Sequence, residues 1–296
     1  MFESSLAIIE DELRVKGRHL LSALENSRRR FGGVWESDCN LVFGIVFPDE
    51  VKLRNATQGY IAFSNQGMRA QIEFQRRGQY RFSSFDEVAH NVYFDPNYMS
   101  SCYLPGLLLS HLLWPHHYAQ LSFYRHIVEK INPGTFAEIG VGTGVYSLFT
   151  LLQFPTINGL GVDISESSLS FSTALLQSAG LIKNYDTHLC DISRTTLPYR
   201  TDLVISVELL EHLENPVGFL RGIRNLIEHG GDAFVTAAIN AAHADHIYLY
   251  GSVADIEAQL RESDLHIVEY IYEPAYNSRR ENELVPAIAA FHLRSA

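Results

Sequence analysis

The sequence predicts an α/β protein whose larger part is a Rossmann-like, seven-stranded, mostly parallel sheet with helices on both faces. From about residue 126 onward, apolar segments typical of strands alternate with segments typical of helices, which indicates a parallel sheet. A glycine-rich loop joins the first of these strands to the first helix, as in nucleotide-binding α/β folds. Residues 1 to about 125 lack the alternation, so we predict two domains, 1–125 and 126–296.

The strands of the second domain are predicted from short apolar runs. They are expected at residues 136–140, 159–163, 188–190, 203–207, 233–237, 267–272 and 288–293. Helices are expected between most of them, at 144–152, 166–179, 216–229 and 252–262. No helix fits between the last two strands, so we expect an antiparallel pair at one edge of the sheet.

The N-terminal domain is predicted to be mainly helical and to form a lid over the second domain. Apolar spacing predicts a first helix over about residues 4–30 that stops at Gly32-Gly33. Arg28, Arg29 and Arg30 would close this helix, where basic residues favour its negative end. The stretch 103–118 is too apolar to face water, so we expect it to pack on the second domain.

Composition excludes several classes of protein. Lys and Arg total 23 against 34 Asp and Glu, and the net charge of −11 argues against nucleic acid as a partner. Three cysteines are too few for a disulfide framework or a thiolate metal site. The sequence has no apolar window long enough for a membrane span, and its acidic start is unlike a signal peptide. We therefore expect a cytoplasmic protein with no membrane partner; the sequence does not indicate its oligomeric state.

The strongest local signal is the glycine loop after the first strand of the second domain. It reads Glu138-Ile139-Gly140-Val141-Gly142-Thr143-Gly144, whereas dinucleotide-binding loops follow the pattern G-x-G-x-x-G. Glu138 lies just ahead of the loop, where it would repel a pyrophosphate. The loop therefore suits a ligand that carries an ammonium group.

This loop resembles the first motif of the class I S-adenosylmethionine-dependent methyltransferases, and the resemblance extends over residues 126–296. It implies S-adenosyl-L-methionine as the cofactor. Asp163 would then bind the ribose hydroxyls, Asp191 would meet the adenine amino group, and Glu208 would face the reaction centre. The residues implied in cofactor binding are Glu138, Gly140, Gly142, Gly144, Tyr146, Asp163, Ile164, Asp191, Ile192 and Glu208.

The sequence Glu208-Leu209-Leu210-Glu211-His212 follows the fourth strand. This E-x-x-E-H string resembles ubiquinone-biosynthesis O-methyltransferases and small-RNA 2′-O-methyltransferases. In the latter, both acids and the histidine bind a divalent metal with another histidine after the fifth strand, for which His243, Asp245 and His246 are candidates here. The implied metal ligands are Glu208, Glu211, His212 and His246. In metal-free relatives the histidine is a base or structural, and His212, Glu208 and His246 are our candidate catalytic residues.

The substrate contacts are predicted from the lid. In this superfamily an N-terminal extension commonly covers the cleft, and aromatic rings near the sulfonium gain from cation–π attraction. Tyr80, Tyr93 and Tyr98 are aromatic candidates of this kind. The predicted substrate-binding residues are Tyr103, His117, Tyr118, Asn240 and His243.

The resemblance implies methyl transfer. A covered cleft with aromatic walls predicts a small, partly apolar acceptor, and we expect a role in secondary metabolism because the lid resembles no housekeeping enzyme. The acceptor would be an oxygen, a nitrogen or an activated carbon, attacking in line. Two alternatives stay open. One is a cyclase that releases methylthioadenosine, because azetidine-2-carboxylate synthases are similar in fold. The other is a non-catalytic cofactor-binding protein, against which the intact glycine loop and ribose acid argue.

Overall fold

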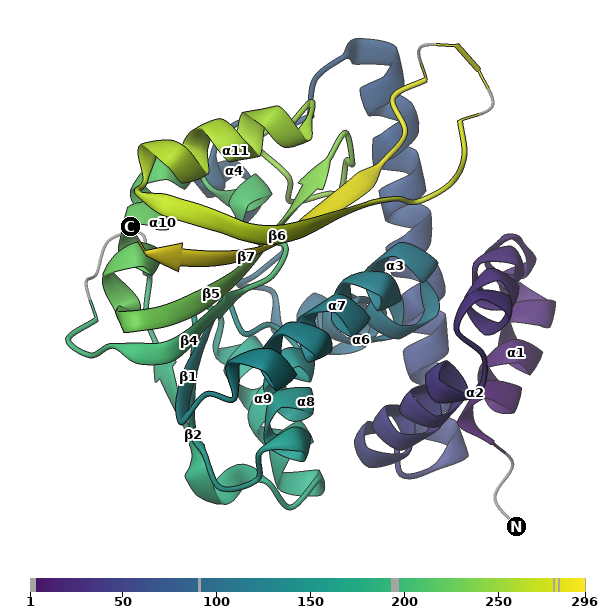
Figure 1. Cartoon of the computed structure of the whole chain (residues 1–296). Coiled ribbons are helices and arrows are strands. Elements are labelled where there is room, and N and C mark those ends of the chain that lie inside the picture. The colour runs from purple at the N-terminus through teal and green to yellow at the C-terminus, as the bar shows by residue number, and fades with distance from the viewer. Residues whose placement is uncertain (1–3, 90–91, 193–196, 279, 282, 296) are drawn as a thin grey trace.

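The computed structural model of this chain describes residues 4–89, 92–192, 197–278, 280–281 and 283–295. Within them, seven strands form one sheet in the order β3-β2-β1-β4-β5-β7-β6 (Figure 1). β7 runs antiparallel to β5 and β6, and the other neighbouring pairs are parallel. The predicted sheet and its antiparallel edge pair are therefore confirmed. The strands are β1 (Thr135–Ile139), β2 (Asn158–Asp163), β3 (Tyr185–Leu189), β4 (Thr201–Ser206), β5 (Ile227–Ile239), β6 (Leu265–Pro274) and β7 (Ala287–Ser295).

Helices cover both faces of the sheet, as predicted. Phe136 of β1 packs with one set of helices and the next residue, Ala137, with the other, because successive side chains of a strand point to opposite faces. The first set is α7 (Pro115–Ile131), α8 (Val145–Gln153) and α9 (Glu166–Ser178); the second is α10 (Pro216–Leu226) and α11 (Val253–Glu262). α10 ends three residues before the predicted 229, because Ile227 already pairs with Thr201 in the sheet.

The described N-terminal residues are mainly helical, as predicted. Figure 1 shows α1 and α2 at one side of the molecule, with the long α3 between them and the sheet domain. The helices are α1 (Ser5–Lys16), α2 (Leu21–Val46), α3 (Glu50–Arg77), α4 (Phe85–Ala89), α5 (Pro96–Tyr98) and α6 (Leu104–Leu113), and a π-helical turn (Met99–Tyr103) precedes α6.

The prediction of one helix over residues 4–30 is wrong in two respects: the chain forms two helices there, and the second continues to Val46. The chain breaks at Gly17, and α2 continues through Gly32, which has φ 62° and only kinks the helix. The reason is a second apolar face beyond the glycines, where Trp35, Cys39 and Phe43 are fully buried. Burial at this helical spacing outweighs the helix-breaking tendency of two glycines.

The N-terminal helices share a core with the sheet domain. The stretch 103–118 is buried as expected, and leucines of α6 lie in one apolar cluster with Trp35 of α2 and Phe136 of β1. Residue 125, the end of the first predicted domain, lies inside α7, so the division into 1–125 and 126–296 stays a prediction. No helix in the described ranges combines the length and apolarity needed to cross a membrane.

Candidate active site

A cavity of about 850 Å³ lies over the carboxyl ends of the central strands. Its floor comes from the loops after β1, β2, β3, β4 and β5, and its roof from N-terminal side chains, among them Phe63, Tyr93, Tyr103 and Trp114. The sheet order changes direction between β1 and β4, which is where ligands bind in open α/β sheets. Both parts of the chain therefore contribute to one site.

The glycine loop is held by Asp163 at the end of β2. Gly140 and Gly142 have φ of 73° and 50°, a region that favours glycine. The Asp163 carboxylate accepts hydrogen bonds from the N–H of Gly142 at 2.9 Å and of Ser165 at 2.8 Å. Burial raises the pKa of Asp163, although these amide bonds oppose the rise. Asp163 thus shapes the loop and also lines the cavity.

Glu138 is buried beneath the same loop. Its carboxylate accepts hydrogen bonds from the backbone N–H of Ser147, at 2.8 Å, and from the Ser147 hydroxyl. Burial raises the pKa of Glu138 to about 8, against the effect of these bonds. A cation beside Glu138 would stabilise the ionised carboxylate, in agreement with the prediction of an ammonium-bearing ligand.

Gly144 does not line the cavity as the cofactor prediction implied. It has φ 73°, and a Cβ there would lie 2.6 Å from the Cβ of Ser172, so only glycine lets α8 begin against α9. The other predicted cofactor residues do line the cavity: Glu138, Gly140, Gly142, Tyr146, Asp163, Ile164, Asp191, Ile192 and Glu208.

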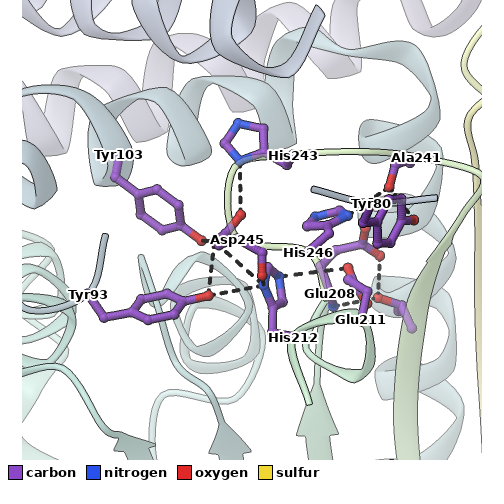
Figure 2. A network of polar contacts seen from close by, with 11 residues as sticks. Tyr80, Tyr93, Tyr103, Glu208, Glu211, His212, Ala241, His243, Asp245 and His246 are labelled. Carbon is purple, nitrogen blue, oxygen red and sulfur yellow. Dashed lines mark hydrogen bonds and ion pairs between the residues drawn. The ribbon is translucent and has the colours of Figure 1, made fainter. Parts of the chain in front are cut away.

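Asp245 lies at the centre of a buried polar network that joins both parts of the chain (Figure 2). Its Oδ2 accepts hydrogen bonds from the hydroxyls of Tyr93 at 2.9 Å and Tyr103 at 2.7 Å, and its Oδ1 lies 3.0 Å from Nδ1 of His243. Burial alone would raise the pKa of Asp245, but the charge of His212 and the bond to His243 hold it well below its usual value. The carboxylate is therefore ionised and fastens the lid to the loop after β5.

The hydrogen bonds assign the tautomers of His212 and His246. Nδ1 of His212 lies 3.0 Å from the carbonyl oxygen of Asp245, and Nδ1 of His246 lies 2.8 Å from that of Ala241. A carbonyl only accepts, so both Nδ1 atoms carry the proton, and Nε2 is the ring nitrogen left free of these bonds. Burial and the neighbouring His212 lower the pKa of His246 to about 3, which keeps it neutral.

Glu211 lies beside these two rings, in the 3-10 turn Leu210–His212 after β4. Its carboxylate is fully buried, and neither oxygen has a hydrogen-bond partner among the described residues. One potential ligand atom from each of Glu211, His212 and His246 lies within 4.8 Å of the others. Burial, and then the charge of Glu208, raises the pKa of Glu211 well above its usual value. A buried carboxylate without a hydrogen-bond partner is unfavourable by itself, whereas this group of ligand atoms suits a bound cation.

Glu208 is not part of that group, contrary to its predicted role as a metal ligand. Its Oε1 accepts a hydrogen bond from Thr236 at 2.7 Å, which turns the carboxylate toward β5. Burial raises the pKa of Glu208 to about 7. Glu208 lines the cavity and stays a candidate base.

The predicted substrate residues divide into two sets. Tyr103, His117 and His243 line the cavity, but Tyr118 and Asn240 do not. Tyr118 donates to Asp38 at 2.6 Å inside the helical core, and Asn240 donates to the carbonyl of Gly251, closing a turn. The structure therefore does not bring these two residues to the cavity, because their side chains are engaged in local structure.

Sequence reasoning missed His111 and Phe63 as cavity residues. His111 lies within an otherwise apolar helix and is 4% exposed. A single histidine in such a run was the available signal. Phe63 lies 4.4 Å, ring to ring, from His243, a contact that joins residues 180 positions apart and leaves no local pattern.

Comparison with known proteins gives matches to methyltransferases. Residues 137–233 match a family described as a methyltransferase domain. The ubiquinone biosynthesis O-methyltransferase of Nitrosomonas europaea is 24% identical over 164 residues, 55% of this chain and 64% of that protein. The enzyme of the same name from Stutzerimonas stutzeri is 28% identical over 97 residues, 33% of this chain and 41% of that protein. The chain thus spans less than two thirds of the length of these relatives.

Solved structures with the same fold cover more of the chain. An O-methyltransferase from neocarzinostatin biosynthesis, in complex with S-adenosyl-L-homocysteine and 1,4-dihydroxy-2-naphthoic acid, aligns with a TM-score of 0.56 and 15% identity over 80% of this chain and 70% of its own. An O-methyltransferase family protein from Burkholderia thailandensis aligns with a TM-score of 0.55 and 12% identity over 82% and 72%. At these identities the likeness concerns the fold.

Proposed function

From the premise that this chain belongs to the class I S-adenosylmethionine-dependent methyltransferase superfamily, we propose that it methylates an oxygen of a small aromatic acceptor. The observation that carries the proposal is the Glu211, His212 and His246 group at the wall of the cavity. The name O-methyltransferase among relatives supports oxygen over nitrogen or carbon. A role in secondary metabolism stays a prediction from the sequence.

The methyl donor would lie along the ends of β3, β2 and β1. Asp191 and Asp163 would hold its adenosine part, and Glu138 its ammonium group. The donor supplies a methyl group made electrophilic by the sulfonium. The chain then mainly has to align the acceptor, and such positioning contributes roughly 7–11 kcal/mol in well-oriented reactions.

The residues after β4 and β5 fit a divalent cation. Glu211 offers a carboxylate without a hydrogen-bond partner among the described residues, and His212 and His246 are oriented by the backbone carbonyls that hold their Nδ1 atoms. Such outer hydrogen bonds to Nδ1 are typical of metal-binding histidines. A bound cation would lower the pKa of an acceptor hydroxyl and hold its oxygen. Two nitrogens and one oxygen suit zinc, iron or manganese.

Glu208 would take the proton of the acceptor. Its pKa near 7 suits a general base at neutral pH, and its Oε1 is already engaged with Thr236. The proton of the hydroxyl would go to Oε2. The freed oxygen attacks the methyl carbon while the carbon–sulfur bond breaks, and S-adenosylhomocysteine leaves.

The size and lining of the cavity support a small, aromatic acceptor. The cavity of about 850 Å³ lies within the range of small-molecule sites, roughly 300–1,000 Å³. Because it would have to hold the donor as well, the acceptor would have to be small. Phe63, Tyr93, Tyr103 and Trp114 supply an aromatic wall.

The experiment incubates purified protein with S-adenosylmethionine and catechols, simple phenols or hydroxynaphthoic acids, with and without a chelator. We expect methylated product that chelator removes and added divalent metal restores. Metal analysis should find about one ion per chain in the wild type, little in Glu211→Gln, and the wild-type amount in the exposed control Glu228→Gln.

Three results would contradict parts of this proposal. Chelator-insensitive turnover without bound metal would leave His212 and His246 as bases or structural residues. Methylthioadenosine formed from S-adenosylmethionine alone would replace methyl transfer by cyclisation. If the protein does not bind S-adenosylhomocysteine, the proposed methyl transfer as a whole is contradicted.

A further inference from the structure

Three further histidines line the cavity, and among the described residues their rings have no hydrogen-bond partner. They are His111 on α6 and His116 and His117 at the start of α7. The Nδ1 atoms of all three are buried, and no hydrogen bond to these rings is found in the described part of the chain. His111 and His117 are 4% and 8% exposed. Burying a polar group without a partner is destabilising, so three such rings indicate a missing ligand.

The charge of the described lining residues indicates which of them can bind an anionic ligand. Its described lining holds eight carboxylate side chains and neither a lysine nor an arginine. Histidines are therefore the sole lining side chains there that can become cationic. His212, His243 and His246 already face Asp245 or Glu211, so the other three are the ones that remain for an anion.

The three rings lie near the α8 end of the glycine loop. His111 is 5.6 Å, ring to ring, from Tyr146, the second residue of α8, and 5.5 Å from His117. Leu107, one helical turn before His111, lies 3.6 Å from the position of a Cβ on Gly142. Asp163 ends β2 and Asp191 follows β3, the two strands beyond β1 in the sheet. With adenosine there, as in the proposed function, the amino-acid end of the donor points toward Glu138 and the histidines.

We propose that His111 and His117, with His116 behind them, bind the carboxylate of the methyl donor, and that one of their rings takes up a proton with it. This inference rests on the proposed function, since it assigns one end of the donor. Glu138 would hold the ammonium group and the histidines the carboxylate on the same carbon. The same rings could bind a carboxylate on the acceptor, and the experiment separates the two sources.

The surroundings of the rings explain why a proton enters with the ligand. Burial lowers the pKa of His111 to about 4 and of His116 to about 3, and burial together with the other two rings holds the pKa of His117 well below its usual value. Arg30 of α2 adds to the lowering at His116, and Tyr146 of α8 faces His111 with a neutral phenol. The rings are therefore neutral at pH 7, and a carboxylate beside them would favour the charged form.

The experiment compares S-adenosylhomocysteine with S-adenosyl-3-thiopropylamine, which lacks the carboxylate alone. Titration calorimetry at pH 6.5 in two buffers of different ionisation heat gives the affinity and the protons taken up for each ligand. Both ligands carry the ammonium group, so any proton lost from Glu138 cancels in the difference. We expect wild type to bind the carboxylate ligand about 10- to 100-fold more tightly, with an excess uptake on the order of one proton.

The variants are His111→Leu and His117→Leu, and the exposed control is His19→Leu. The preference for the carboxylate ligand should fall toward unity in the first two and stay unchanged in the control. This ratio is measured within one folded sample, so a loss of stability does not imitate the result.

Equal binding of the two ligands to wild type would overturn the inference while leaving the proposed function intact. So would variants that keep the donor preference but lose the preference for a carboxylated acceptor, because the carboxylate would then belong to the acceptor. Wild-type protein that binds neither ligand would instead contradict the proposed function.

Discussion

Replacing Tyr103 by phenylalanine tests whether Asp245 joins the lid to the sheet domain. The Tyr103 hydroxyl donates to Asp245 at 2.7 Å, and both side chains are buried. A hydrogen bond to a charged group contributes about 1.5–3 kcal/mol. At about 2–4 °C per kcal/mol for a chain of this size, the melting temperature should fall by roughly 3–12 °C.

The assay is thermal unfolding from pH 5 to pH 8, with Tyr98→Phe as the matched control. The pKa of Asp245 lies well below its usual value in the folded protein. Its stabilising effect is therefore present above the unfolded pKa of about 3.9 and is lost only as the pH falls through the lower folded pKa. The difference between wild type and Tyr103→Phe should accordingly be constant over this range.

The control breaks a bond of similar geometry to a neutral partner, because Tyr98 donates to the amide oxygen of Gln66. It should lower stability by about 0.5–1.5 kcal/mol. If Tyr103→Phe melts with wild type, or loses no more than Tyr98→Phe, Asp245 does not act as a charged anchor and the reasoning fails.

Three further outcomes are expected. Asp163→Asn should weaken S-adenosylhomocysteine binding about 10- to 100-fold in calorimetry, because the glycine loop loses charge-assisted bonds, while Asp186→Asn on the exposed face of β3 should bind normally. Gly142→Val should abolish that binding, because φ of 50° strains a β-branched residue and its side chain meets Leu107; normal affinity would contradict our placement of the donor. Ligand-free Glu138→Gln should exceed wild type in melting temperature at pH 8 and match it near pH 4. The raised pKa of Glu138 stabilises the folded state below about pH 4.5, and this stabilisation is lost as the pH rises through about 8. A gain in melting temperature that does not depend on pH would refute this reasoning.

The sheet was predictable because its central strands are buried on both faces and so appear as apolar runs. Acids directly after such runs, Asp163 and Glu208, identified the cavity edge in advance. The long N-terminal helix was not predictable from its glycines. Gly32 is tolerated because Trp35 lies buried on α2 and donates to the carbonyl of Leu112 at 2.6 Å, a contact that no local pattern encodes.

The candidate site was predictable in its motifs but not in its network. Glu211, His212 and His246 were identified from the chain, yet His212 is oriented by Asp245, whose tyrosine partners lie 142 and 152 residues away. Tyr118 resembled a substrate contact by its position in the lid, but Asp38 binds its hydroxyl. Pairings over such sequence distances come from tertiary packing, which a single sequence does not display.

The loop after β5 depends on the N-terminal helices for its shape. Gln71 of α3 bonds the backbone of Asn240 and Ala242, Tyr80 bonds the carbonyl of Ala241, and Tyr103 bonds Asp245. The two parts are therefore expected to evolve together. A chimera that joins a foreign N-terminal part to this sheet domain would leave the loop after β5 without these hydrogen bonds. Changes in acceptor preference should arise by paired substitutions on both sides of this contact rather than by exchange of whole domains.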